Sequence, residues 1–225
     1  MSPTLLLDLD GTLVDSVPDL AAALNRLAAS RGLAPFTAAE VTAMVGDGAG
    51  ALVHRAMAAR GAEPSQDAVR TFLEDYGAHA AVFTKPYPGV VPTLRALASE
   101  GWRLAVCTNK PEAPARRLLA ELGMLEVFAA VGGGDSFAAR KPDPAHPLAT
   151  LERAGGVPGA AVVVGDHRND VSAALGAGLP CIFAAWGYGP PEMAHGARAT
   201  AGGFEEVPAL ARALLGEAPR GALRG

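Results

Sequence analysis

The sequence predicts an α/β protein in which a parallel sheet lies between two layers of helices, with an all-helical domain inserted after the first strand. Short runs rich in Val, Leu and Ile alternate with longer helical patterns, and several of these helical patterns end at a glycine. Residues 16–85 contain helical patterns but no convincing strand. Alternation of strands and helices favours parallel pairing, because parallel strands need a long crossover connection.

The expected strands are short and apolar throughout, as in sheets buried on both faces. They are Thr4–Leu9, Arg103–Thr108, Ala161–Gly165 and Pro180–Ala185. The helical patterns of the same region are Val90–Glu100, Pro111–Leu122, Pro144–Ala154 and Val171–Ala177. Residues 1–15 and 86–225 are therefore predicted to form a three-layer, Rossmann-like core whose ligands bind outside the carboxyl ends of the strands. The tail from Glu217 is expected to fray.

The insert contains four Ala-rich helical patterns. They are Val17–Ser30, Ala38–Met44, Ala49–Arg60 and Gln66–Ala80. An insert that follows the first strand lies near the carboxyl edge of the sheet, so residues 16–85 are predicted to form a cap above the ligand site. The alternative is a set of packing helices with no part in the chemistry.

Composition and charge narrow the function classes. The net charge is −4 and there is no basic run, which argues against a nucleic-acid partner. No apolar stretch approaches the ~20 residues of a membrane span, and no signal sequence opens the chain, so we expect a cytoplasmic protein without a membrane partner. Cys107 and Cys181 lie in apolar runs and are interpreted as buried hydrophobic residues. Lysine is rare and occurs at Lys85, Lys110 and Lys141.

Two aspartates, Asp8 and Asp10, follow the first apolar run and precede Gly11. Residues i and i+2 of a strand point to the same side, so we expect the two carboxylates to project together where the chain turns at Gly11. Two like charges are costly to bury unless a cation neutralises them, which suits Mg²⁺ and a nucleophilic carboxylate. The alternative is an ordinary Asp-Gly turn with both acids in solvent.

The later strands also end in polar residues suited to phosphate chemistry. Thr108 and Asn109 supply a hydroxyl and an amide just before a helix, whose N-terminus attracts anions. Lys141 lies in a proline-fixed loop from which its charge can reach a phosphate. Asp166 and Asp170 bring the number of acids to four, a crowding that requires a cation and a phosphoryl group. Taken alone, Thr108 would be interpreted as a plain helix cap. The alternative for Lys141 is a solvated loop lysine, which the rarity of lysine in this chain disfavours.

These groups of residues, in this order and with a helical insert after the first, resemble the four motifs of the haloacid dehalogenase-like hydrolase superfamily. The resemblance covers essentially the whole chain. It implies that Asp8 is the nucleophile, which forms an aspartyl-phosphate, and that Asp10 is the general acid and base. Dehalogenases of the superfamily lack an acid at the position of Asp10 and P-type ATPases carry Thr there, so the resemblance is to a phosphatase or phosphomutase.

The resemblance also implies the ligands of the site. The cofactor is Mg²⁺, held by Asp8, the main-chain carbonyl of Asp10, and Asp166. The phosphate-binding residues are Thr108, Asn109 and Lys141. Asp170 supports the site, either beside the ion or by orienting Lys141.

A finer similarity is to the bacterial phosphoglycolate phosphatase family. The matching segments include Asp15–Leu20, Val45–Val53, Tyr87–Val90, Gly133–Ser136 and Gly187–Gly189. This similarity implies hydrolysis of a small anionic substrate, 2-phosphoglycolate, to glycolate and phosphate, by a monomer or homodimer. A nucleotide, pyrophosphate or sugar phosphate is the nearest alternative substrate. A β-phosphoglucomutase-type mutase is disfavoured because the insert contains no lysine before Lys85. A non-catalytic regulator is disfavoured because clustered acids destabilise a fold and would not be kept without a use.

The glycines at 46, 48 and 50 follow a helical pattern, whereas a dinucleotide-binding fingerprint needs a preceding strand. We interpret them as a turn whose N–H groups, with Gly46, face the site and bind a substrate carboxylate. His54 and Arg55 are candidates for the same anion, although exposed positions on the helix are the simpler interpretation. His167 stands where the family usually has Ser; it either retunes substrate or pH preference or is a surface loop histidine.

Overall fold

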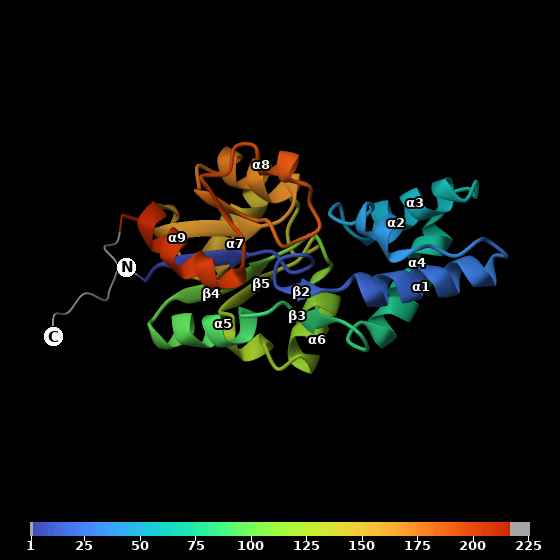
Figure 1. Ribbon diagram of the computed structural model, residues 1–225, viewed down its shortest axis with the longest axis horizontal. Helices are drawn as coiled ribbons and strands as arrows, with labels where there is room; N and C mark the ends of the chain where they lie inside the picture. Colours follow the sequence, from blue (N-terminus) through green and yellow to red (C-terminus); the bar gives the residue numbers. More distant parts are fainter. Residues whose placement is uncertain (1, 217–225) are drawn as a thin grey trace.

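The structure is a computed structural model that describes residues 2–216 (Figure 1). The expected fraying of the tail from Glu217 lies outside these residues. The strands are β1 (Thr4–Leu7), β2 (Val14–Asp15), β3 (Lys85–Pro86), β4 (Arg103–Cys107), β5 (Ala130–Gly132), β6 (Ala161–Gly165), β7 (Cys181–Ala184) and β8 (Ala199–Ala201). The α-helices are α1 (Val17–Ser30), α2 (Ala38–Thr42), α3 (Ala49–Ala59), α4 (Gln66–His79), α5 (Val90–Ser99), α6 (Glu112–Glu121), α7 (Ala145–Arg153), α8 (Arg168–Gly176) and α9 (Val207–Leu214).

The main sheet is parallel, and its strand order is β5-β4-β1-β6-β7-β8. The strand β1 lies inside the sheet, with Leu5 paired to Leu104 on one side and to Val162 on the other. The predicted α/β class with a parallel sheet is therefore confirmed. The strands β5 and β8 were not expected, because three residues are too few for an apolar pattern to be recognised.

Helices cover both faces of this sheet, which gives the three predicted layers (Figure 1). Alternate residues of β1 face opposite sides, as strand geometry requires. Leu5 and Leu7 belong to the hydrophobic core beneath α5, α6 and α9, whereas Leu6 belongs to the core beneath α7 and α8. Both faces of the central strands are buried, which explains why they are apolar throughout.

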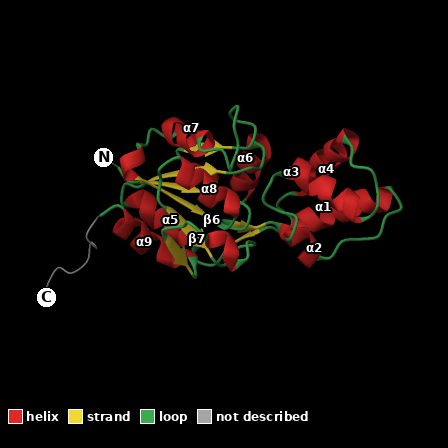
Figure 2. Cartoon of the chain, turned by 90° about the horizontal axis from the view of Figure 1, so that it is seen from above, coloured by secondary structure: helices red, strands yellow, loops and turns green. Residues whose placement is uncertain are grey.

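The helices α1–α4 form a separate block with a hydrophobic core of its own, which includes Leu24, Met57 and Phe72. In Figure 2 this block stands beside the sheet-containing part of the chain and is joined to it by narrow connections. The connections run side by side as the short antiparallel pair β2–β3, in which Val14 pairs with Pro86. The residues at which the predicted insert begins and ends therefore lie next to each other.

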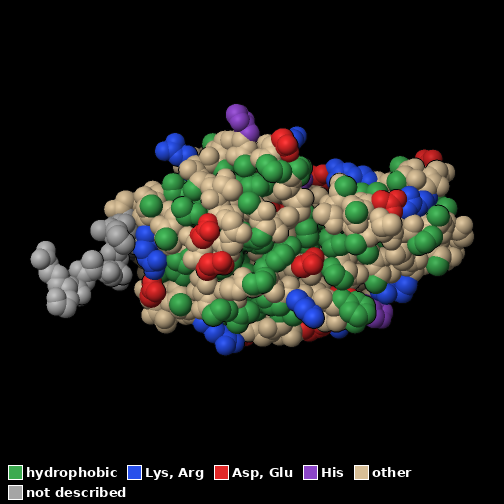
Figure 3. Space-filling model, in the orientation of Figure 1, with side chains coloured by type: hydrophobic (Ala, Val, Ile, Leu, Met, Phe, Trp, Pro, Cys, Tyr) green, Lys and Arg blue, Asp and Glu red, His purple; other side chains and the backbone are tan. Residues whose placement is uncertain are grey.

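The surface shows no single region of one charge on the face drawn in Figure 3, where Lys and Arg side chains are scattered. Among residues 2–216, none of the helices combines the length and apolar character that crossing a bilayer requires. Cys107 and Cys181 are buried and free, as predicted.

Candidate active site

Asp8 directly follows β1 and Asp10 lies in the turn beyond it, so the strand expected over Thr4–Leu9 ends two residues earlier than predicted. The strand ends at Leu7. The N–H group of Val14 donates to the carbonyl oxygen of Leu9 over 3.0 Å, which wraps the chain back on itself. Gly11 takes a φ of +86° in this turn, and a Cβ there would collide with the carboxylate of Asp166. The turn therefore separates the side chains of the two aspartates.

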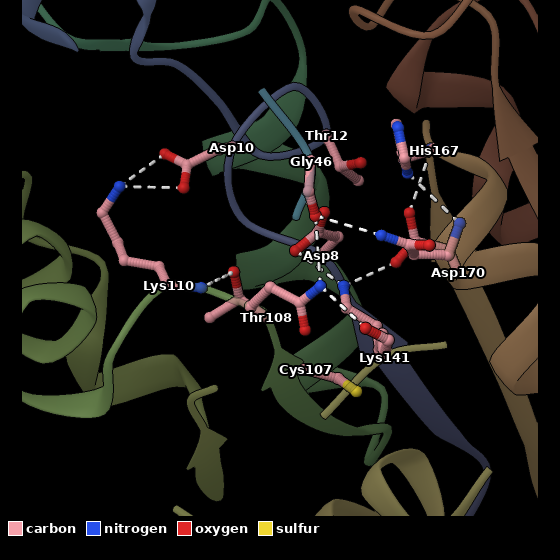
Figure 4. A network of polar contacts seen from close by, with 12 residues as sticks. Asp8, Asp10, Thr12, Gly46, Cys107, Thr108, Lys110, Lys141, His167 and Asp170 are labelled. Carbon is pink, nitrogen blue, oxygen red and sulfur yellow. Dashed lines mark hydrogen bonds and ion pairs between the residues drawn. The ribbon is translucent and has the colours of Figure 1, made fainter. Parts of the chain in front are cut away.

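The carboxylate of Asp8 faces Lys141 (Figure 4). Its Oδ1 lies 2.9 Å from the Nζ atom of Lys141, and the same Nζ lies 2.5 Å from Oδ1 of Asp170. Although burial opposes the charged form, the carboxylates of Asp170 and Asp8 raise the pKa of Lys141. Within the described chain, Oδ1 of Asp8 is buried and accepts no well-directed hydrogen bond. One buried ammonium thus bridges two acids.

Three acids converge at this point. Asp8, Asp166 and Asp170 each offer a carboxylate oxygen, and these oxygens lie within 4.8 Å of one another. Burial raises the pKa of Asp8 to about 6, against the opposing effect of Lys141. Burial also raises the pKa of Asp166 to about 8, and the charges of Asp8 and Asp170 add to this effect. A cation bound among them would favour the ionised form of all three acids.

The donor set fits a magnesium ion. Carboxylate oxygens are the ligands that this hard cation prefers, and Asp8 retains an acceptor atom without a hydrogen bond. The expected ligands Asp8 and Asp166 are brought together here. Asp170, expected to support the site, lies within the same cluster, while the side chain of Asp10 lies outside it.

The acids at this edge are held in place by hydrogen bonds from distant parts of the chain. Thr12 Oγ1 and the N–H group of Tyr188 donate to the two oxygens of Asp166, each over 2.8 Å. The N–H group of His167 donates to Oδ2 of Asp170 over 3.0 Å, in a capping arrangement that starts α8. The helix therefore begins at Arg168, three residues before the expected start.

The carboxylate of Asp10 faces a different lysine, Lys110 (Figure 4). The Nζ atom of Lys110 lies 2.8 Å from both oxygens of Asp10. This ammonium also lies 4.8 Å from the centre of the Tyr76 ring, which comes from α4. We had predicted no role for Lys110. Two features of the sequence could have indicated a role for Lys110: lysine is rare in this chain, and Lys110 directly follows Thr108 and Asn109.

Thr108 and Asn109 follow β4 and lie at the same edge of the sheet. Thr108 is buried, and its Oγ1 accepts a hydrogen bond from the N–H group of Lys110 over 3.2 Å. The side-chain amide of Asn109 donates to the carbonyl of Gly46 (3.1 Å) and to that of Lys141 (3.0 Å). Asn109 therefore joins the helical block to the loop that carries Lys141.

Gly46 lies at the site, but Arg55 does not. The carbonyl of Gly46 also accepts a hydrogen bond from the side chain of Asn169 over 3.3 Å. The guanidinium of Arg55 is paired with Asp47 and donates to a backbone carbonyl of the helical block. It lines a separate cavity of about 450 Å³, on whose wall His167 also lies.

A small cavity of about 50 Å³ lies between the strand ends and the helical block. Its polar lining comes from the two aspartates of the first turn and from the segment after β4. Its apolar lining comes from α1, α3, α4 and the start of α6. The lining residues are Asp8, Asp10, Leu20, Val45, Gly46, Gly48, Ala49, Leu52, Phe72, Leu73, Tyr76, Thr108, Asn109, Lys110, Pro111 and Pro114.

Comparison with known proteins places these features in context. The family model of the haloacid dehalogenase-like hydrolases matches residues 3–178. A phosphoglycolate phosphatase of Agrobacterium fabrum is 45% identical over 192 residues, which cover 84% of this chain and 82% of the relative. A phosphoglycolate phosphatase of Cereibacter sphaeroides is 41% identical over 222 residues, which cover 95% of this chain and 99% of the relative.

Solved structures give the same result. The crystal structure of a predicted phosphoglycolate phosphatase from Haemophilus somnus superposes with a TM-score of 0.86 and 31% sequence identity. The match covers 93% of this chain and 97% of that one. The fold is therefore shared over nearly the full length.

Proposed function

Because this chain belongs to the haloacid dehalogenase-like hydrolases and is a phosphatase, we propose that it uses Mg²⁺ and an aspartyl-phosphate to hydrolyse 2-phosphoglycolate to glycolate and phosphate. The observation that carries the mechanism is the buried carboxylate of Asp8, whose Oδ1 is paired with the ammonium of Lys141 over 2.9 Å and accepts no well-directed hydrogen bond. The phosphoglycolate phosphatases at 41–45% identity support the substrate.

In the first step a carboxylate oxygen of Asp8 attacks phosphorus. The Asp8–phosphorus bond forms as the bond from phosphorus to the substrate alcohol oxygen breaks, and Asp10 donates the proton that this oxygen needs. Lys141 neutralises charge on the phosphoryl oxygens, and the hydroxyl of Thr108 donates to them.

In the second step water attacks the same phosphorus, and Asp10 takes the proton from that water. The Asp8–phosphorus bond breaks, and phosphate and free Asp8 result. Mg²⁺ held by Asp8, Asp166, Asp170 and the main-chain carbonyl of Asp10 would supply charge neutralisation around the phosphoryl group.

Residues 16–85 serve as a cap in this proposal. The cap contacts the core through the carbonyl of Gly46, which accepts hydrogen bonds from Asn109 and Asn169. Its apolar side chains line the small cavity above Asp8 and keep bulk water out of it. Water exclusion strengthens the electrostatic interactions of the site.

The cavity beside Asp8 and Asp10 is small and is lined mostly by apolar side chains of the cap, which supports a small alcohol as leaving group. Nucleotides, pyrophosphate and sugar phosphates remain the alternative substrates, and the mutase reaction is less favoured. A cytoplasmic location, a monomeric or dimeric state and the absence of a nucleic-acid partner stay predictions.

A phosphate-release screen with Mg²⁺ tests the function. We expect release from 2-phosphoglycolate to exceed release from nucleotides, pyrophosphate and sugar phosphates, and to stop when the metal is chelated. Asp8→Asn should abolish release, while Asp67→Asn, at an exposed position on α4, should not. Release from none of the compounds, or full activity of Asp8→Asn, would overturn the proposal.

A further inference from the structure

The cavity beside Asp10 contains the buried hydroxyl of Tyr76. Tyr76 is only 3% exposed, and among the described residues its hydroxyl has no well-directed hydrogen-bond partner, although the ammonium of Lys110 lies beside the ring, 4.8 Å from its centre. Its ring is stacked on Phe72 with a centroid distance of 5.7 Å and an angle of 3°, so packing fixes its orientation. A buried hydroxyl without a partner is costly. This group therefore points to a polar atom of a ligand.

Lys110 places a positive charge next to this hydroxyl. Among the described residues that line the cavity, Lys110 alone is basic. An ammonium has three N–H donors, and the oxygens of Asp10 accept two hydrogen bonds from it. The third donor is not taken up by Asp10 and lies beside Tyr76 in a buried environment, where an interaction with an anion is stronger than in water.

The start of α3 forms a third part of the same wall. Gly48 is the residue at which this helix is capped, and no side chain bonds to the free N–H groups of its first turn. Gly48 and Ala49 both line the cavity. The free N–H groups and the helix dipole favour a negative charge there.

From these three features we propose that Tyr76, Lys110 and the N-terminus of α3 form a subsite for a carboxylate on the substrate. The inference rests on the proposed function and deepens it: the preferred substrate is a small phosphorylated acid rather than a neutral phosphomonoester of the same size. The Tyr76 hydroxyl and the third N–H of Lys110 donate to the carboxylate. The apolar side chains around them surround the short carbon chain.

The proposal assigns the carboxylate to different residues from those expected from the sequence alone. Arg55, the basic residue that follows the glycine-rich turn, is paired with Asp47 in the other cavity. The N–H groups of the glycine-rich turn still bind the substrate carboxylate in this proposal, as expected from the sequence. Lys110, which comes from the core, supplies the charge.

Binding of two matched phosphonates tests the subsite without any turnover. 3-Phosphonopropionate has the length of 2-phosphoglycolate and a carboxylate, and propylphosphonate has the same chain without the carboxylate. In the wild-type protein with Mg²⁺, calorimetry should show tighter binding of 3-phosphonopropionate. Tyr76→Phe should reduce this preference about tenfold, as expected for one hydrogen bond to a charged group. Tyr87→Phe removes a tyrosine hydroxyl outside the cavity and should leave the preference unchanged.

A matching kinetic measurement compares 2-phosphoglycolate with ethyl phosphate. The ratio of their kcat/KM values should fall about tenfold in Tyr76→Phe, through KM rather than kcat. Equal weakening of both ligands and both substrates by Tyr76→Phe would mean a purely structural role and would overturn the subsite. An enzyme that releases phosphate from both substrates without preference would overturn the subsite alone, whereas release from neither would overturn the proposed function.

Discussion

The imidazole ring of His167 occupies the space that a side chain at position 46 would need. A Cβ atom on Gly46 would lie 2.7 Å from Nε2 of His167, closer than real Cβ contacts come. Gly46 also has a φ of +126°, a conformation that side chains disfavour. A residue of the core thus packs directly against the loop between α2 and α3.

We predict that Gly46→Ala lowers kcat/KM for 2-phosphoglycolate at least tenfold, because the loop must move away from the site. Adding His167→Ser should restore part of the loss, since the smaller side chain removes the collision but not the unfavourable φ. Steady-state kinetics of the two single variants and the double variant measure this coupling. Wild-type activity in Gly46→Ala would contradict it.

The second prediction separates the two proton transfers assigned to Asp10. In Asp10→Asn, turnover of 2-phosphoglycolate should fall by about 10²- to 10⁴-fold, because its alkoxide needs a proton to leave. p-Nitrophenyl phosphate releases a stable anion, so its first turnover should survive while hydrolysis of the aspartyl-phosphate becomes slow.

Rapid mixing should therefore show a burst of p-nitrophenol in Asp10→Asn, followed by a slow steady rate. The size of the burst should match the concentration of active sites. If both substrates lose activity equally and no burst is seen, Asp10 does not have the assigned roles.

The third prediction concerns the buried charge of Lys141. Lys141→Met leaves Asp8 and Asp170 buried without their cation, which should lower the free energy of unfolding by about 3–5 kcal/mol. Urea denaturation in the absence of divalent ions measures this loss. Lys85→Met is the matched control: Lys85 is exposed, so its replacement should change the stability by less than about 0.5 kcal/mol.

The fourth prediction is a pH-dependent effect of Mg²⁺ on stability. The pKa values of Asp8 and Asp166 in the fold, about 6 and about 8, lie above the ordinary value of 3.8. Between pH 4 and pH 8 these two groups therefore hold more protons in the metal-free folded chain than in the unfolded chain, and their contribution to stability falls as the pH rises. Ionised carboxylates bind the cation, so Mg²⁺ should raise the melting temperature more at pH 8 than at pH 5.5.

Thermal melts with Mg²⁺ and with a chelator, at both pH values, check this expectation. Asp166→Asn should remove most of the increase, because it removes a ligand and part of the mutual repulsion. An equal increase at both pH values would show that the ion does not compete with protons for these carboxylates.

Much of the fold and of the site was predictable from the chain alone. Apolar runs separated by helical patterns determine a parallel sheet, and a parallel sheet brings the ends of its strands to one edge. That rule is sufficient to place Asp8, Thr108 and Asp166 near one another. The edge strands β5 and β8 were missed because each is only three residues long.

The direction in which each side chain points could not be predicted from the sequence and is given only by the tertiary structure. Asp8 and Asp10 are neighbours in sequence, but the turn closed on the carbonyl of Leu9 sends one toward Lys141 and the other toward Lys110. No periodic pattern of residues predicts such a turn, because its hydrogen bonds depend on the path of the following residues in the folded chain.

The sequence by itself determined the α/β architecture, the edge at which the acids gather and the chemistry of the motifs. These properties follow from local periodicity and residue type, which each segment carries without its partners. Only the tertiary structure decided that Lys110 pairs with Asp10, that Tyr76 faces the same cavity and that His167 lies against Gly46. Such contacts join segments many residues apart, and their geometry exists only once the core and the helical block are packed together.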